Sequence, residues 1–144
     1  MAVLESQTKT VRQMVAEAKG RVESLSVEQA AAEIGGDVTL VDVREDDERF
    51  LEGAIPRSVH VPRGMLELSA DPESPLHRKE FGRDRRVILY CSSGSRSALG
   101  ADTMRGMGYE NVVHLHGGRW RGNGADAPWS RYLSLECPRS EERP

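Results

Sequence analysis

The sequence predicts an α/β fold, a three-layer sandwich with a mainly parallel central sheet flanked by helices. Two observations lead to this prediction. Short apolar runs of strand length alternate with helical patterns along the 144 residues, and this alternation is typical of parallel sheets with helical connections. The runs are also nearly continuous, as at residues 38–43, which is the pattern of a strand that is covered on both faces.

The N-terminal part of the chain is predicted to be helical. Apolar residues fall at helical spacing within residues 1–20, and Gly20 is expected to end this helix. A second helix is predicted to begin at Ser26 and to end at Gly35, the first glycine of a pair.

The later elements follow from the same patterns. Apolar runs predict strands, and stretches with acidic residues, buried alanines or helical spacing predict helices. In order, we expect a strand at 38–43, a helix within 44–51, a short strand at 58–61, short helices joined by loops within 65–81, a strand at 87–90, a helix from Ser97 to about residue 105, and a last strand at 111–115.

Composition sets limits on the class of protein. The chain is 38% hydrophobic and 30% charged, as in a water-soluble globular domain, and it contains no apolar run of transmembrane length. A net charge of −3 gives no overall basic field to hold nucleic acid. The first residues lack the basic-then-apolar order of a secretory signal. We therefore expect a cytoplasmic protein with neither nucleic-acid nor membrane partners.

Cysteine and histidine usage gives little support to a metal site. Two cysteines, Cys91 and Cys137, are too few for a disulfide framework or a four-cysteine metal site. Cys137 lies in a charged terminal segment and is interpreted as a bystander rather than a resolving thiol. His114 and His116 form a candidate metal pair, but no third ligand is evident, so ordinary polar strand residues are the favoured interpretation. We expect no metal and no other cofactor.

The most informative segment is the strand, loop and helix around Cys91. The apolar run at 87–90 leads into this cysteine, and a Ser/Gly loop, Arg96 and a helical pattern follow. This order places the thiol over a helix N-terminus, where backbone N–H groups and the helix dipole favour negative charge. With an arginine close by, Cys91 is expected to be a thiolate nucleophile at neutral pH that acts on an anionic substrate.

Each residue of the loop fits that chemistry. Gly94 permits a turn that brings successive N–H groups toward the sulfur. The hydroxyls of Ser92, Ser93 and Ser95 can face the centre of the loop, and Ser97 is expected to cap the helix. The pattern Cys-x-x-Gly-x-Arg is also one residue shorter than a tyrosine phosphatase loop. A tighter ring suits one extra sulfur atom better than a phosphate, so sulfur transfer is preferred.

These motifs resemble those of single-domain rhodaneses, which are thiosulfate sulfurtransferases. The similarity covers about residues 22–118, with the motifs in the family's order. The matching segments are the loop at 91–97, Leu-Val-Asp-Val-Arg-Glu at 40–45, Glu-Gly-Ala-Ile-Pro at 52–56, Gly-Tyr-Glu-Asn-Val at 108–112 and Leu-His-Gly-Gly at 115–118. The family usually has histidine at position 54 and glycine at position 57, where this chain has Ala54 and Arg57, and these differences are interpreted as packing details.

The resemblance implies a rhodanese-like fold and a mechanism. Residues 22–125 would form the domain, 1–21 a helical extension, and 126–144 an atypical C-terminal tail, since the segment after Gly118 has poor helix propensity. The Cys91 thiolate would take sulfane sulfur from thiosulfate or a persulfide donor. A thiol or cyanide, with a thioredoxin-like protein as one candidate acceptor, would then remove it. Arg96 would hold the oxyanion of the substrate or the loop itself.

Some alternatives remain open from the sequence. Asp42 and Arg44, at the end of the strand at 38–43, are expected to support the site, either by tuning it or as an ion pair that fixes the following turn; the ion pair is favoured. A phosphatase or arsenate reductase of the related cysteine-loop type is a second reading. A rhodanese-like module that binds partners without catalysis is a third.

Overall fold

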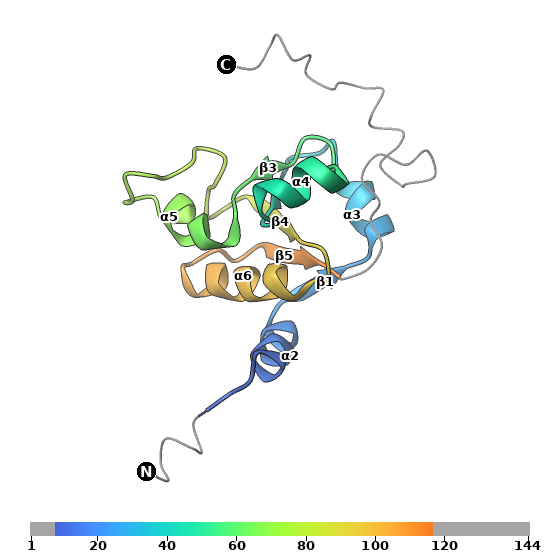
Figure 1. The fold of residues 1–144 in the computed structure, drawn as a ribbon. Helices are drawn as coiled ribbons and strands as arrows, with labels where there is room; N and C mark the ends of the chain where they lie inside the picture. The colour runs from blue at the N-terminus through green and yellow to red at the C-terminus, as the bar shows by residue number, and fades with distance from the viewer. Residues whose placement is uncertain (1–7, 117–144) are drawn as a thin grey trace.

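The computed structural model describes residues 8–116, and a five-stranded parallel sheet lies at their centre (Figure 1). The order of the strands is β1-β5-β4-β2-β3, and every neighbouring pair is parallel. The strands are β1 (Glu23–Leu25), β2 (Val38–Asp42), β3 (Val59–His60), β4 (Arg86–Tyr90) and β5 (Val112–Leu115). The predicted α/β class with a parallel sheet is confirmed.

Helices cover both faces of this sheet, which gives the predicted three layers (Figure 1). One face carries α3 (Val27–Glu33) and α4 (Asp46–Glu52), and the other carries α2 (Val11–Arg21), the short 3-10 helix η1 (Arg63–Met65), α5 (Leu66–Ala70) and α6 (Ser95–Gly106). No helix within residues 8–116 has the length and apolar character needed to cross a bilayer.

The core consists of two apolar clusters, one on each side of the sheet. Leu40 and Ile88 are register partners and belong to the cluster under α3. Val41 and Leu89, the next partners along the same strands, belong to the cluster under α5 and α6. This alternation follows from the pleat, because successive side chains of a strand point to opposite faces. Both faces of the central strands are covered, so apolar residues follow one another at Leu40 and Val41 and again at Ile88 and Leu89.

Two predicted helix boundaries were wrong. The helix α2 does not end at Gly20 but continues through Arg21, whose guanidinium donates to the Asp102 carboxylate at 2.9 and 2.7 Å and so fastens the last turn to α6. The helix α6 begins at Ser95 rather than at Ser97. Its N-cap is Gly94, whose φ of 93° lies in the left-handed region that favours glycine.

Two further features differ from the sequence-based expectations. The edge strand β1 was not predicted, since it has three residues, of which only Leu25 is buried. Arg57, at the position where the family usually has glycine, has a φ of 69°. A left-handed conformation costs an L-residue about 1–2 kcal/mol. The difference from the family at position 57 therefore concerns backbone conformation, and its interpretation as a packing detail was wrong.

Candidate active site

Cys91 directly follows β4 and precedes the N-terminus of α6, as predicted. Its sulfur accepts hydrogen bonds from two backbone N–H groups, that of Gly94 at 3.1 Å and that of Ser97 at 3.4 Å. The residue is only 3% exposed and belongs to the apolar cluster on the α6 side of the sheet. Both donors belong to the start of the 12-residue helix α6, where backbone N–H groups interact favourably with negative charge.

The serines of the loop do not all face the sulfur. The Ser92 hydroxyl donates to the Glu48 carboxylate at 3.1 Å, and that of Ser93 lies 3.4 Å from the Ser95 oxygen. Both Ser92 and Ser93 are exposed. The expectation that these hydroxyls face the centre of the loop was therefore wrong for Ser92 and Ser93. Ser92 contacts Glu48 on α4, and Ser93 contacts Ser95 within the loop.

Ser97 has a different position from the expected helix cap. It lies in the first turn of α6, is fully buried, and donates its hydroxyl to the Gly94 carbonyl at 3.2 Å. Its oxygen is also 3.5 Å from the Cys91 sulfur. Ser97 therefore braces the turn from inside the helix and contacts the nucleophile with both its backbone and its side chain.

A buried histidine continues this line of polar contacts. His114, on β5, has Nδ1 at 3.2 Å from the Ser97 oxygen and Nε2 at 2.8 Å from the Ser24 oxygen on the edge strand. Burial, together with the charge of Lys19, lowers the pKa of His114 to about 4, so the imidazole is neutral at physiological pH. From the sequence, His114 is expected only to be a polar strand residue or a metal ligand, so its contact with Ser97 was missed.

Arg96 is held by a carboxylate that the sequence analysis did not identify as part of the site. Its two terminal nitrogens donate to the two oxygens of Glu48 at 2.7 and 2.8 Å. The hydrogen bonds from Arg96 lower the pKa of Glu48 to about 2, and those same bonds raise the pKa of Arg96. Glu48 lies on α4, within an acidic stretch for which the sequence predicts a helix and nothing more. Nothing in the neighbouring sequence therefore indicated that Glu48 would pair with Arg96.

Asp42 and Arg44 form a buried ion pair, the favoured of the two sequence interpretations. Arg44 donates to both Asp42 oxygens, at 3.0 and 2.9 Å, and both side chains are fully buried. Burial raises the pKa of Asp42, but the hydrogen bonds from Arg44 outweigh this effect, so it lies below its ordinary value. Arg49 and the Tyr90 hydroxyl also donate to Asp42, at 2.9 and 3.0 Å.

This network links α4 to the strand that carries the nucleophile. Arg44 also donates to the carbonyl of Gly53, just after α4, at 2.7 Å. Tyr90 immediately precedes Cys91, and its hydroxyl accepts the Ile55 N–H at 3.1 Å. Burial, together with the charge of Asp42, raises the pKa of Tyr90 to about 12. The ion pair therefore supports the base of the loop through Tyr90 and α4.

Several predicted features fall outside the part of the chain that the structure describes. These are Cys137, the glycine pair at 117–118 and the tail at 126–144. Within residues 8–116 no group of three or more histidine, cysteine or acidic residues is arranged to hold a metal ion. Where the domain boundaries lie stays a prediction, although α2 packs against α6 and contributes the buried Ala18.

Comparisons with known proteins identify the family of this chain. The model of the rhodanese-like domain family matches residues 26–120. A sulfurtransferase of Allochromatium vinosum is 35% identical over 96 residues, which cover 67% of this chain and 78% of that protein.

Solved structures share the fold of this chain. A Rhodopseudomonas palustris protein of unknown function, described as a possible tyrosine phosphatase, is 38% identical with a TM-score of 0.73, and the match covers 77% of this chain and 86% of that one. The human single-domain sulfurtransferase TSTD1 is 20% identical with a TM-score of 0.59, over 81% of this chain and 99% of its own, and shows the shared fold. The chain belongs to the rhodanese-like domain family.

Proposed function

We propose that this protein is a sulfurtransferase that carries sulfane sulfur as a persulfide on Cys91. The observation that supports the proposal best is the pair of N–H donors from Gly94 and Ser97 on the Cys91 sulfur. Preorganised donors of this kind stabilise negative charge without reorganisation during the reaction. Family membership and the sulfurtransferase relatives support an enzyme of this type.

The proposed reaction has two steps. In the first, the Cys91 thiolate attacks the outer sulfur of the donor, a new S–S bond forms, and the donor's S–S bond breaks. The leaving group, sulfite from thiosulfate or a thiolate from a persulfide, takes the electron pair. In the second step an acceptor thiolate or cyanide attacks the outer sulfur of the Cys91 persulfide, and the Cys91 thiolate leaves. This is covalent catalysis of the ping-pong kind, and a thioredoxin-like thiol is a suitable acceptor.

The residues around Cys91 have separate roles in this scheme. The N–H groups of Gly94 and Ser97 bind the charge that stays on sulfur in the thiolate and in the persulfide. Ser97 keeps these donors aligned through its bond to the Gly94 carbonyl. Asp42 and Arg44 act from a distance, through Tyr90 and α4, and are positioning residues.

A cysteine-loop phosphatase is the second candidate, and the description of the Rhodopseudomonas palustris structure favours it. The sequence of the loop opposes it, because only four residues separate Cys91 from Arg96. In addition, Arg96 is held by Glu48, whereas a phosphatase would use this arginine to bind the phosphate. Sulfur transfer is therefore the better account.

Mass spectrometry of the full chain tests the proposal. After exposure to thiosulfate or to the persulfide of a small thiol, we expect one added sulfur atom on the peptide with Cys91 and none on the peptide with Cys137. Cyanide should remove this sulfur, and the C91S variant should gain none. Hydrolysis of an aryl phosphate without any sulfur loading would favour the phosphatase. Failure of both activities would contradict an enzymatic role and favour a binding module.

A further inference from the structure

The charge around the loop arginine bears on which sulfur donor the site accepts. An arginine at this position is expected to meet the oxyanion of a donor such as thiosulfate. Here both terminal nitrogens of Arg96 are engaged by the two oxygens of Glu48, at 2.7 and 2.8 Å. Such a two-point pair is among the strongest charge-assisted contacts that an arginine makes. The cation that would attract an anionic donor is thus already neutralised.

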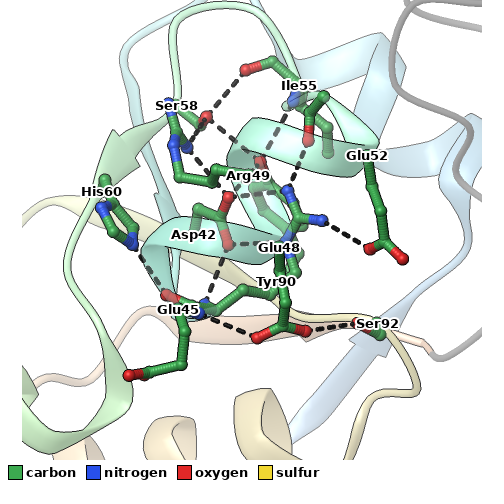
Figure 2. A network of polar contacts seen from close by, with 12 residues as sticks. Asp42, Glu45, Glu48, Arg49, Glu52, Ile55, Ser58, His60, Tyr90 and Ser92 are labelled. Atoms are coloured by element: carbon green, nitrogen blue, oxygen red, sulfur yellow. Dashed lines mark hydrogen bonds and ion pairs between the residues drawn. The ribbon is translucent and has the colours of Figure 1, made fainter.

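Glu48 is also held in place from its other side. One of its oxygens accepts the Ser92 hydroxyl at 3.1 Å, and the other accepts the backbone N–H of Glu45 at 2.9 Å (Figure 2). Its side chain is 25% exposed, and that of Arg96 is 34% exposed. The carboxylate is therefore fixed between the start of α4 and the Cys91 loop.

The other charged side chains on and beside α4 do not replace Arg96 as a cation for the donor. The first turn of α4 adds the carboxylates of Asp46 and Asp47. The nearby guanidinium groups of Arg44 and Arg49 both bind Asp42. An approaching donor would therefore meet the Glu48 carboxylate at Arg96, and the first turn of α4 adds further negative charge.

We propose that Glu48 makes this site selective for thiol persulfides over thiosulfate. The inference rests on the proposed sulfur transfer and concerns its donor. Thiosulfate carries two negative charges, and its sulfonate oxygens would need Arg96. A persulfide R–S–SH carries at most one charge at its reacting end and needs no oxyanion site.

The persulfide reaction is balanced without any further group. The Cys91 thiolate bonds to the terminal sulfur of R–S–SH, which keeps its proton, and the donor's S–S bond breaks. The thiolate R–S⁻ leaves with the electron pair. The total charge is unchanged in this step, because the neutral donor brings no charge and R–S⁻ carries away the charge that Cys91 held, so Arg96 has no added charge to compensate.

The test compares two donors on four proteins, the wild type and three variants, by the second-order rate constant for loading sulfur onto Cys91, measured by mass spectrometry. The donors are thiosulfate and the persulfide of a small uncharged thiol. The E48Q variant removes the charge but keeps an oxygen for the Glu45 N–H. We expect the thiosulfate-to-persulfide ratio of rate constants to rise at least about fivefold in E48Q, since a unit charge at contact distance changes binding by roughly this factor even in water.

Two control variants test whether the change in the ratio comes from the Glu48 charge and from Arg96. D46N removes one charge from the same turn of α4, where Asp46 pairs with His60, and should change the ratio less than about twofold. In the double variant E48Q/R96Q the gain should disappear, because the released cation is absent.

Wild-type loading from thiosulfate as fast as from the persulfide would overturn the selectivity and leave sulfur transfer intact. An unchanged ratio in E48Q, or an equal rise in D46N, would also overturn the role of Glu48. Loading from neither donor, in any of these proteins, would instead refute the proposed function itself.

Discussion

Replacement of His114 by glutamine should make the protein less sensitive to acid. The pKa of His114 is about 4 in the folded protein and about 6.5 for a free side chain, because the residue is fully buried. Between these values the unfolded chain binds a proton that the folded chain does not, so wild-type stability falls as the pH drops from 6.5 to 4. At about 1.4 kcal/mol per pKa unit, the loss is roughly 3 kcal/mol.

Urea unfolding at several pH values between 7.5 and 4 measures this effect. H114Q should be less stable than the wild type at pH 7.5, because its amide does not reproduce both bonds to Ser97 and Ser24. The difference should shrink by roughly 3 kcal/mol toward pH 4. H116Q is the control for loss of an exposed histidine, and it should alter the profile much less, since the charge of His116 is a smaller cause of the lowered His114 pKa than burial. Parallel acid profiles for H114Q and the wild type would refute the assignment of the buried, neutral imidazole.

Two further predictions concern the supports of the loop. Replacement of Arg44 by methionine leaves Asp42 buried without its main partner and should reduce the free energy of unfolding by about 3–5 kcal/mol. The control R85M breaks the exposed pair with Asp37 and should change that free energy by less than about 1 kcal/mol. Equal effects of the two variants in urea unfolding would contradict this account. G94A forces alanine into a left-handed conformation, so it should cost about 1–2 kcal/mol and slow sulfur loading of Cys91 by displacing the N–H donor. G20A in the last turn of α2, where a Cβ meets no atom, should stabilise the protein by about 0.4–1 kcal/mol. A neutral G94A would contradict the need for glycine in the turn before α6.

The sheet and the position of the nucleophile were predictable because their signals are local. Continuous apolar runs indicate strands covered on both faces, as β2 and β4 are. A cysteine between such a strand and a helix lies at the helix N-terminus by chain connectivity alone, and the N–H contacts to Cys91 bear this out. The Asp42–Arg44 pair was predictable for the same reason, since its members are two residues apart.

The parts that were missed depend on contacts between distant segments. Glu48 and Arg96 are 48 residues apart, and nothing near Glu48 distinguishes it from the other acidic residues of α4. The strand β1 depends on pairing with β5, about 90 residues away. His114 carried a signal that went unused: a histidine within an otherwise apolar strand must find hydrogen-bond partners when it is buried, and Ser97 and Ser24 supply them.

Arg44 has a consequence for how this site tolerates changes in chain length. Its guanidinium binds Asp42, before α4, and the Gly53 carbonyl, after it, so both ends of the intervening segment are anchored. An inserted residue would therefore be absorbed by the helix itself and would rotate Glu48 by about 100° around the helix axis. Arg96 would then lose its carboxylate, so an insertion or deletion within α4 would alter the charge beside the nucleophile without any change in the Cys91 loop.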